Sequence, residues 1–288
     1  MVLAQLDKIL PDSFETIFHS MPIVHQWVSN LKTTGVAVFI QKIFAEMEVV
    51  HIMGLFMLSA SVILTSLRLI GVGMTNQSPS VIEKNTRIFL HIGIVLAIGS
   101  GILIGISNAE KLYNSSAFLM KMIAMVAGII FAYAVMIPVA KADGQAGTSA
   151  RPAFMIALAI WVISLVFFSV KNGANTGMFH VLSAGGMIAF IALQGKLRWV
   201  FLAGVTAIFV VWNIVTHMII LESAGLAYMN ANKLFMYITG AWVLALSLVN
   251  IYGKSAVAGT TNFGRMVGYA TILVWVTVGA GGRWIGLS

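Results

Sequence analysis

Eight apolar stretches follow one another along this chain, each roughly the 20 residues that an α-helix needs to cross a bilayer. They cover residues 49–70, 88–107, 117–140, 153–170, 177–194, 199–221, 235–252 and 266–286. Only 9% of the 288 residues are charged and 59% are hydrophobic, whereas a soluble domain carries about 25% charged residues. The pattern predicts an all-α membrane protein, a polytopic bundle of about eight transmembrane helices whose first partner is the lipid bilayer.

The N-terminal residues 1–48 are expected to form a separate interfacial segment. Within them, residues 12–31 place apolar side chains at helical spacing among polar ones, which predicts an amphipathic helix too polar to span. We expect a kink at Pro22, because proline cannot donate a backbone hydrogen bond. The first residues, 1–11, lack the pattern of a cleavable signal peptide.

Basic residues predict how the helices are oriented. The formal net charge is +8, but the lysines and arginines stand at helix ends rather than on one face, so no nucleic-acid partner is expected. One side of the predicted bundle collects Arg68, Lys84, Arg87, Lys141, Arg151, Lys196, Arg198, Lys254 and Arg265, and the other Lys111, Lys121, Lys171, Lys233 and Arg283. The positive-inside rule then predicts that the first side is cytoplasmic and that both termini lie outside, which in a Gram-negative bacterium means the periplasm.

The two halves of the chain resemble each other. Residues 109–118 resemble residues 225–235, and Trp161 and Trp275 occupy matching places in the fourth helix of each half. These matches predict a tandem repeat of four helices, 49–172 and 173–288. Because four is an even number, both repeats are expected to have the same orientation in the membrane.

Four short motifs carry a family resemblance. They are Glu48-Val-Val-His51-Ile-Met-Gly54, Ser66-Leu-Arg68-Leu-Ile-Gly71, Ala117-Phe118-Leu-Met-Lys121 and Gly282-Arg283-Trp284-Ile285. The chain resembles an uncharacterised family of small bacterial membrane proteins, classed as a domain of unknown function. That family usually has Asp at the position of Ser66, and its members are shorter, so this chain resembles a doubled version. More distantly, it resembles CopD-type copper-resistance membrane proteins and four-helix b-type cytochromes. The resemblance implies a helical bundle in a bacterial inner membrane and no established activity.

Histidines inside the apolar stretches are the first candidates for function, because ionisable groups are costly in a membrane. The predicted topology puts His51, His180 and His217 near the outer side and His91 near the inner side. Opposed imidazoles suit a b-type haem. We therefore expect His51 and His180 as axial ligands with His217 as a substitute, and Lys121, Lys171 or Arg283 beside the propionates. The histidines could equally be packing elements that bond to the backbone.

Two further hypotheses remain open from the sequence. Met47, Met53, Met178 and Met218 neighbour the three outer histidines, and thioether with imidazole suits copper. The chain could also be a cofactor-free subunit of a larger membrane complex or homo-oligomer. The leading hypothesis is a haem protein that carries electrons between the quinone pool or a membrane partner and a periplasmic partner. Nucleotide-binding and hydrolase motifs are absent, so whether the chain is an enzyme stays open.

Overall fold

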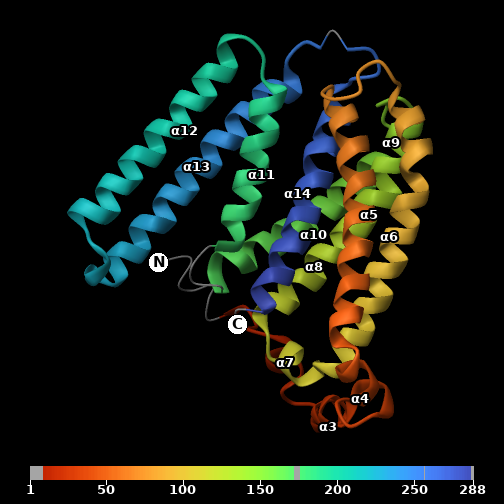
Figure 1. The fold of residues 1–288 in the computed structure, drawn as a ribbon. Coiled ribbons are helices and arrows are strands. Elements are labelled where there is room, and N and C mark those ends of the chain that lie inside the picture. The colour runs from red at the N-terminus through yellow and green to blue at the C-terminus, as the bar shows by residue number, and fades with distance from the viewer. Residues whose placement is uncertain (1–8, 172–175, 256, 287–288) are drawn as a thin grey trace.

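The computed structural model describes residues 9–171, 176–255 and 257–286, and every predicted apolar stretch lies in a helix or consecutive helices to within two residues (Figure 1). The helices are α5 (Phe44–Ile70), α6 (Pro79–Ser107), α8 (Ser116–Ile130), α10 (Ala150–Lys171), α11 (Thr176–Ala192), α12 (Lys196–Ile214), α13 (Leu226–Tyr252) and α14 (Asn262–Ile285). The π-helical turns η1 (Phe131–Met136) and η2 (Val215–Ile219) continue α8 and α12, and α9 (Ile137–Lys141) follows η1. The described residues contain no strand. The all-α membrane bundle is confirmed.

Seven helices in the described part of the chain are long and apolar enough to cross a membrane. The apolar part of α11, Met178–Ala192, is shorter. Helix α6 begins nine residues before the predicted stretch. The prediction started too late because the first turns of this helix are polar. The Ser78 hydroxyl accepts from the N–H of Val81, Pro79 occupies the first turn, and Arg87 pairs with the buried Glu83 at 2.5 Å. Hydropathy alone does not detect such a polar helix start.

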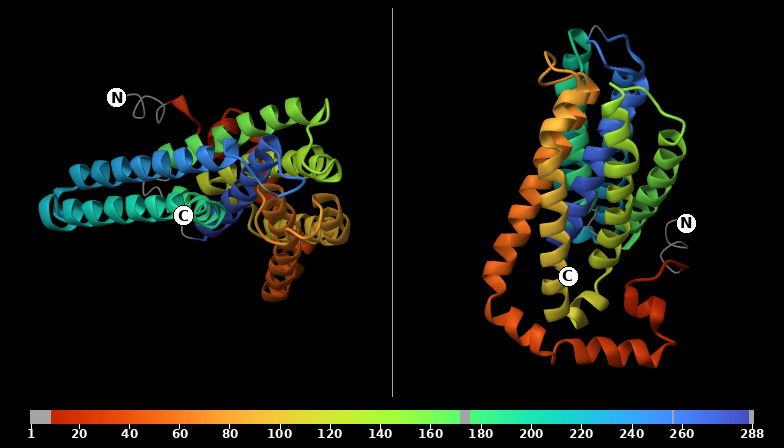
Figure 2. Two further views of the ribbon diagram at one scale, coloured as in Figure 1. Left: turned by 90° about the horizontal axis from the view of Figure 1, so that it is seen from above. Right: turned by 90° about the vertical axis from the view of Figure 1, so that its right-hand side faces the viewer.

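The stretch 12–31 forms two short helices, α2 (Phe14–Phe18) and α3 (Pro22–Leu31), instead of one kinked helix, and α4 (Gly35–Lys42) follows them. Pro22 lies in the first turn of α3, where its missing N–H costs nothing, so it starts a helix rather than bending one. Helices α3 and α4 lie across the end of the bundle where α5 begins (Figure 2). The membrane-interface location stays a prediction.

The centre of the bundle consists of α5, α6, α8 and α14, with α10 packed on α8 and α11 on α14. Helices α12 and α13 form a hairpin that leans away from this centre (Figures 1 and 2). The largest buried cluster joins residues of α5, η1, α10 and α14, including Leu58, Phe131, Ala157 and Val274. Because α14 is the last helix in the sequence, the centre depends on contacts between distant parts of the chain.

Two glycines set the separation of α5 and α6. A Cβ atom on Gly54 would lie 2.6 Å from the backbone nitrogen of Ala97, and one on Gly93 would lie 2.4 Å from that of Leu58. Both distances are too short for a real Cβ contact, so only glycine allows this approach. Small residues are the usual means of close helix packing in membranes, where lipid gives no hydrophobic drive to association.

The two predicted repeats differ in their packing. Helix α5 packs along α6, whereas α12 diverges from α11 and pairs with α13. Helix α14 also packs against α5 and α8 of the other half. The repeat and the 49–172 and 173–288 boundaries stay a prediction.

Candidate ligand cavity at His51 and Lys121

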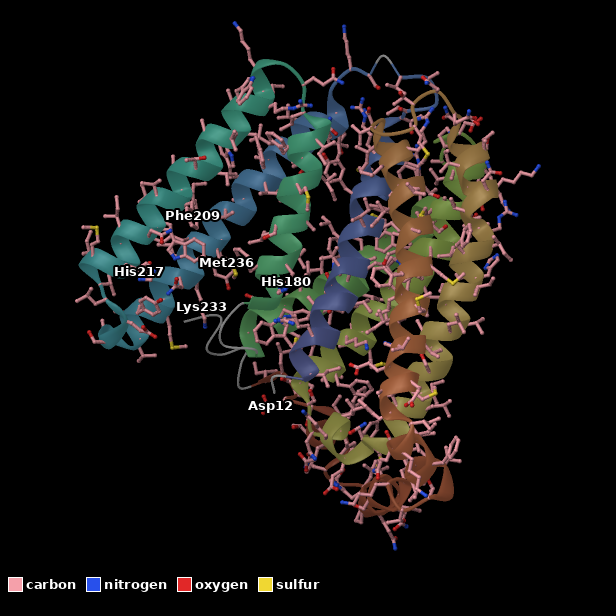
Figure 3. The ribbon with its side chains drawn as sticks, in the orientation of Figure 1. Asp12, His180, Phe209, His217, Lys233 and Met236 are labelled. Atoms are coloured by element: carbon pink, nitrogen blue, oxygen red, sulfur yellow. The ribbon has the colours of Figure 1, made fainter. Side chains whose placement is uncertain are left out.

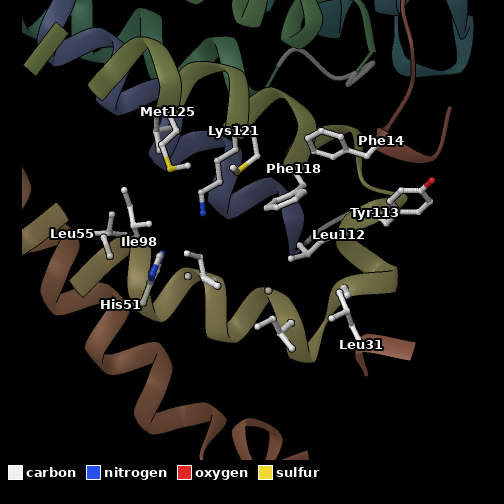
Figure 4. Close-up of a pocket in the computed structure, with 18 of the residues that line it drawn as sticks. Phe14, Leu31, His51, Leu55, Ile98, Leu112, Tyr113, Phe118, Lys121 and Met125 are labelled. Atoms are coloured by element: carbon white, nitrogen blue, oxygen red, sulfur yellow. The ribbon is translucent and has the colours of Figure 1, made fainter. Parts of the chain in front are cut away.

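A cavity of about 320 Å³ lies in the half of the bundle where α5 and α8 begin and α14 ends (Figure 4). Helices α5, α6, α8 and α14 form its walls, and α3 and the short helix α7 (Ala109–Tyr113) line the end near the N-terminal segment. The lining is mostly apolar and includes Leu55, Leu58, Ile94, Ile98, Ile102, Leu112, Met122 and Val278. This volume is at the lower end of the range for small-molecule sites.

His51 is held by a hydrogen bond that fixes its tautomer. Its Nδ1 lies 3.0 Å from the hydroxyl oxygen of Ser100. That hydroxyl donates its single hydrogen to the carbonyl of Leu96 at 2.5 Å, so it accepts from the ring. His51 therefore carries its proton on Nδ1, and Nε2 keeps a free lone pair. Gly101 makes room for the ring, because a Cβ there would lie 3.2 Å from Cε1 of His51.

Lys121 enters the same cavity from the opposite wall. Its side chain extends from α8 toward His51 on α5, and the two point into one space (Figure 4). Helix α14 leaves room for Lys121 because residue 281 is a glycine. A Cβ on Gly281 would lie 2.9 Å from Cβ of Lys121, which is too close. The ammonium forms no hydrogen bond or ion pair with any residue that the structure describes. The cavity therefore presents a free donor facing a free acceptor.

The N-terminal segment contributes directly to the cavity. Trp27, Val28 and Leu31 of α3 line it beside Tyr113 of α7. The ring of Tyr113 meets that of His25 edge to face at 5.3 Å, and its hydroxyl has no hydrogen-bond partner among the described residues. Burial, together with the nearby carboxylate of Glu15, raises the pKa of Tyr113 above its ordinary value, so the phenol stays protonated.

The structure does not bring His180 or His217 to this cavity. Helix α14 packs against α5 on one side and α11 on another, so it stands between the helices that carry His51 and His180. His217 is exposed near the end of the α12–α13 hairpin, on the far side of it from His180 (Figure 3), and its ring lies 6.4 Å from that of Tyr228. In this structure the two repeat-related histidines do not face each other.

The remaining predicted partners lie apart from His51. Arg283 is exposed near the end of α14, and the side chain of Lys171 lies outside the described residues. Met53 and Met218 are exposed at the surface, and Met178 packs against the cluster of Ala117 and Phe168. No group of three or more histidine, aspartate or glutamate side chains that could hold a metal occurs in the described parts of the chain.

Sequence reasoning missed several residues of the cavity. Met122 and Met125 of α8 and Trp275 of α14 line it, and Ser100 orients His51 from outside the lining. A signal for α8 was present, since Met122 and Met125 are three residues apart and so share a helix face with Lys121. Ser100 had no such signal, because its partner is 49 residues away.

Comparison with known proteins gives a family for this chain. Residues 31–183 match the model of a family of unknown function, DUF6644. The chain belongs to this family. The matched region includes His51, Ser100 and Lys121, while Gly281 and Trp275 of α14 lie beyond it. No curated protein and no solved structure matches, and the resemblance to CopD-type proteins and b-type cytochromes is not confirmed.

Proposed function

We propose that this protein binds a membrane-soluble quinol, with the head group between His51 and Lys121 and the tail along the apolar part of the cavity. The observation that carries the proposal is the free acceptor Nε2 of His51 facing the unpartnered ammonium of Lys121 across an apolar cavity. Both side chains are half-buried, and each turns a polar atom toward a mostly apolar space, so the pair favours a ligand that supplies hydrogen-bond partners to both.

A hydroxyl group matches both side chains at once. It can donate its hydrogen to Nε2 of His51 and accept a hydrogen bond from Lys121. A quinone carbonyl only accepts, so it would satisfy Lys121 and leave Nε2 of His51 without a donor. The site therefore favours the reduced, hydroxyl-bearing form of the ligand.

The rest of the cavity suits a single ring with an apolar tail. Aliphatic side chains of α5 and α6 line its walls, and Gly101 of α6 leaves room for the His51 ring that faces the ligand. A quinol site of this kind is what electron transport from the quinone pool to a periplasmic partner requires.

Intrinsic fluorescence tests the proposal, because Trp27 and Trp275 line the cavity. A short-tailed quinol added to detergent-purified protein should quench this fluorescence with saturation. His51→Phe and Lys121→Met keep side-chain bulk but remove one hydrogen bond each. Lys121→Met should weaken binding about tenfold or more, since a hydrogen bond to a charged group contributes about 1.5–3 kcal/mol, and His51→Phe about fivefold, the equivalent of about 1 kcal/mol. His217→Phe is the matched control and should bind like wild type. Equal affinity in all four proteins would refute the proposal.

A second candidate follows from Met122 and Met125, whose side chains line the cavity opposite His51. A neutral imidazole with its Nδ1–H already bonded is suitable for metal ligation, and thioethers suit either a haem iron or Cu(I). Haem bound there would supply one-electron transfer. A methionine of α8 is a better partner for His51 than His180 is, because α14 lies between α5 and α11. Lys121, which lines the same cavity, would supply the cation that a propionate needs.

Absorbance and elemental analysis distinguish this second candidate from the first. A Soret band with iron in the purified protein supports haem b, and copper without such a band supports a copper site. Either signal should be lost in His51→Phe and kept in His217→Phe. Neither metal, combined with no quenching by the quinol, would leave the cofactor-free subunit as the better hypothesis.

A further inference from the structure

A second cavity, of about 280 Å³, lies at the opposite end of the bundle from His51. The end of α5, the turn between α11 and α12, and the loop between α13 and α14 enclose it. This is the end that collects most of the arginines and lysines of the chain. Its lining combines apolar side chains such as Leu193 and Val257 with Arg265, Lys254 and Gln194.

Arg265 is the central group of this second cavity. Its side chain is buried, with only 4% of the residue exposed. Nη1 donates to the carbonyls of Asn250, Ile251 and Gly253 at the end of α13, at 2.8 Å for Gly253. Its Nε and Nη2 donate to none of the residues that the structure describes. The guanidinium is therefore held rigidly by one nitrogen while two others stay unsatisfied.

No aspartate or glutamate is among the described residues that line this cavity, so the charge of Arg265 has no counter-ion there. A buried cation without a partner carries a large desolvation cost, which backbone carbonyls offset only in part. Lys254 and Gln194 are exposed at the rim and add further donors. The arrangement is suited to an anion that accepts several hydrogen bonds.

We propose that this second cavity binds a phosphate group, and that the phosphate is the head group of an anionic phospholipid. Guanidinium and ammonium groups are the preferred partners of phosphate oxygens. The lipid is favoured over free phosphate because the cavity lies at the end of spanning helices, where head groups gather, and because half of its wall is apolar. Basic pockets between spanning helices commonly bind anionic head groups.

Native mass spectrometry of the detergent-purified full chain tests the proposal with three probes: phosphatidylglycerol, phosphatidylcholine and inorganic phosphate. Phosphatidylglycerol should bind best, because its phosphate charge is not balanced by a choline. Lys254→Gln should weaken its binding about fivefold, since a basic residue near a charged lipid surface contributes about 1 kcal/mol. Ser255→Trp keeps every charge but fills the cavity mouth, and should weaken binding at least as much.

Lys84→Gln is the matched control, because Lys84 is an exposed lysine at the same end of the bundle outside this cavity. It should bind phosphatidylglycerol like wild type. If phosphate competes fully with the lipid at equal concentration, the site binds the free anion and the lipid assignment is overturned. If Lys254→Gln and Ser255→Trp both bind like Lys84→Gln, the cavity is not the binding site and the whole proposal is overturned. Neither result depends on the His51 cavity.

Discussion

Gly281 of α14 lies directly against Lys121 of α8, and a Cβ atom at residue 281 would be 2.9 Å from Cβ of the lysine. This contact joins the last helix of the chain to the cavity that His51 lines. It also explains why two motifs about 160 residues apart, Ala117–Lys121 and Gly282–Ile285, belong to one structural unit.

Enlarging Gly281 should therefore displace α14 and Lys121 together. We expect Gly281→Val to lower the free energy of unfolding by about 1–3 kcal/mol, as overpacking commonly does, and to weaken quinol binding. Thermal unfolding in detergent and the fluorescence titration measure the two effects. Gly279→Val is the control, because a Cβ at residue 279 meets no atom within 4 Å. Equal destabilisation by both variants would contradict the account of this contact.

The close packing of α5 against α6 should likewise be disrupted by a larger residue at Gly93. A Cβ there would lie 2.4 Å from the backbone nitrogen of Leu58. Because the clash is with backbone and not with a flexible side chain, a larger residue would push the two helices apart. Gly93→Val should destabilise the protein by about 1–3 kcal/mol or more, seen as a lower midpoint of thermal unfolding. Gly99→Val, on the same helix with open space around it, should unfold like wild type. An unchanged midpoint in Gly93→Val would show that the helices are not in close contact there.

Ser100 positions His51 without lining the cavity. Replacing it by alanine should free the ring to rotate and to change tautomer. Quinol binding should weaken about fivefold, the equivalent of one hydrogen bond of about 1 kcal/mol, while the preference for quinol over quinone should shrink. Ser107→Ala, which removes a hydroxyl bonded only to its neighbours Ile104 and Asn108, should leave both unchanged. A loss of affinity with the preference intact would mean that Ser100 acts on packing alone.

Arg265 should matter for stability through the carbonyls that it holds at the end of α13. Arg265→Met leaves those acceptors without their donor, and this loss should exceed the desolvation cost that is relieved, so the unfolding free energy should fall by about 1–3 kcal/mol. Arg283→Met is the matched variant on the same helix. Because Arg283 is exposed, its replacement should change stability by no more than about 0.5 kcal/mol. Similar thermal midpoints for the two variants would show that Arg265 has no structural role.

The sequence could predict the helices because the length and hydropathy of each apolar stretch are enough to indicate a membrane-spanning helix. It could not predict the first turns of α6, because these turns are polar. Their charged residues Glu83 and Arg87 form an ion pair with each other. The sequence also could not distinguish a kink at Pro22 from a helix start, because the two differ only in the residues before the proline.

Of the candidate site, His51 and Lys121 could be predicted one at a time, but their pairing and the Ser100 contact could not. His51 and Lys121 each stood out as ionisable groups in apolar helices, and the structure brings them to one cavity. Pairing His51 with His180 assumed that the two repeats meet face to face. Helix α14 occupies that place instead, and its close approach depends on Gly268 and Gly281, which become informative only when their contacts are known.

Photo-crosslinking with an azido-quinol, followed by peptide mass spectrometry, tests the central claim most directly. The account predicts adducts on the residues of α3, α5, α6 and α8 that line the His51 cavity, and their loss in Lys121→Met and His51→Phe. Adducts spread over the exposed faces of α12 and α13, at yields that neither variant changes, would contradict it.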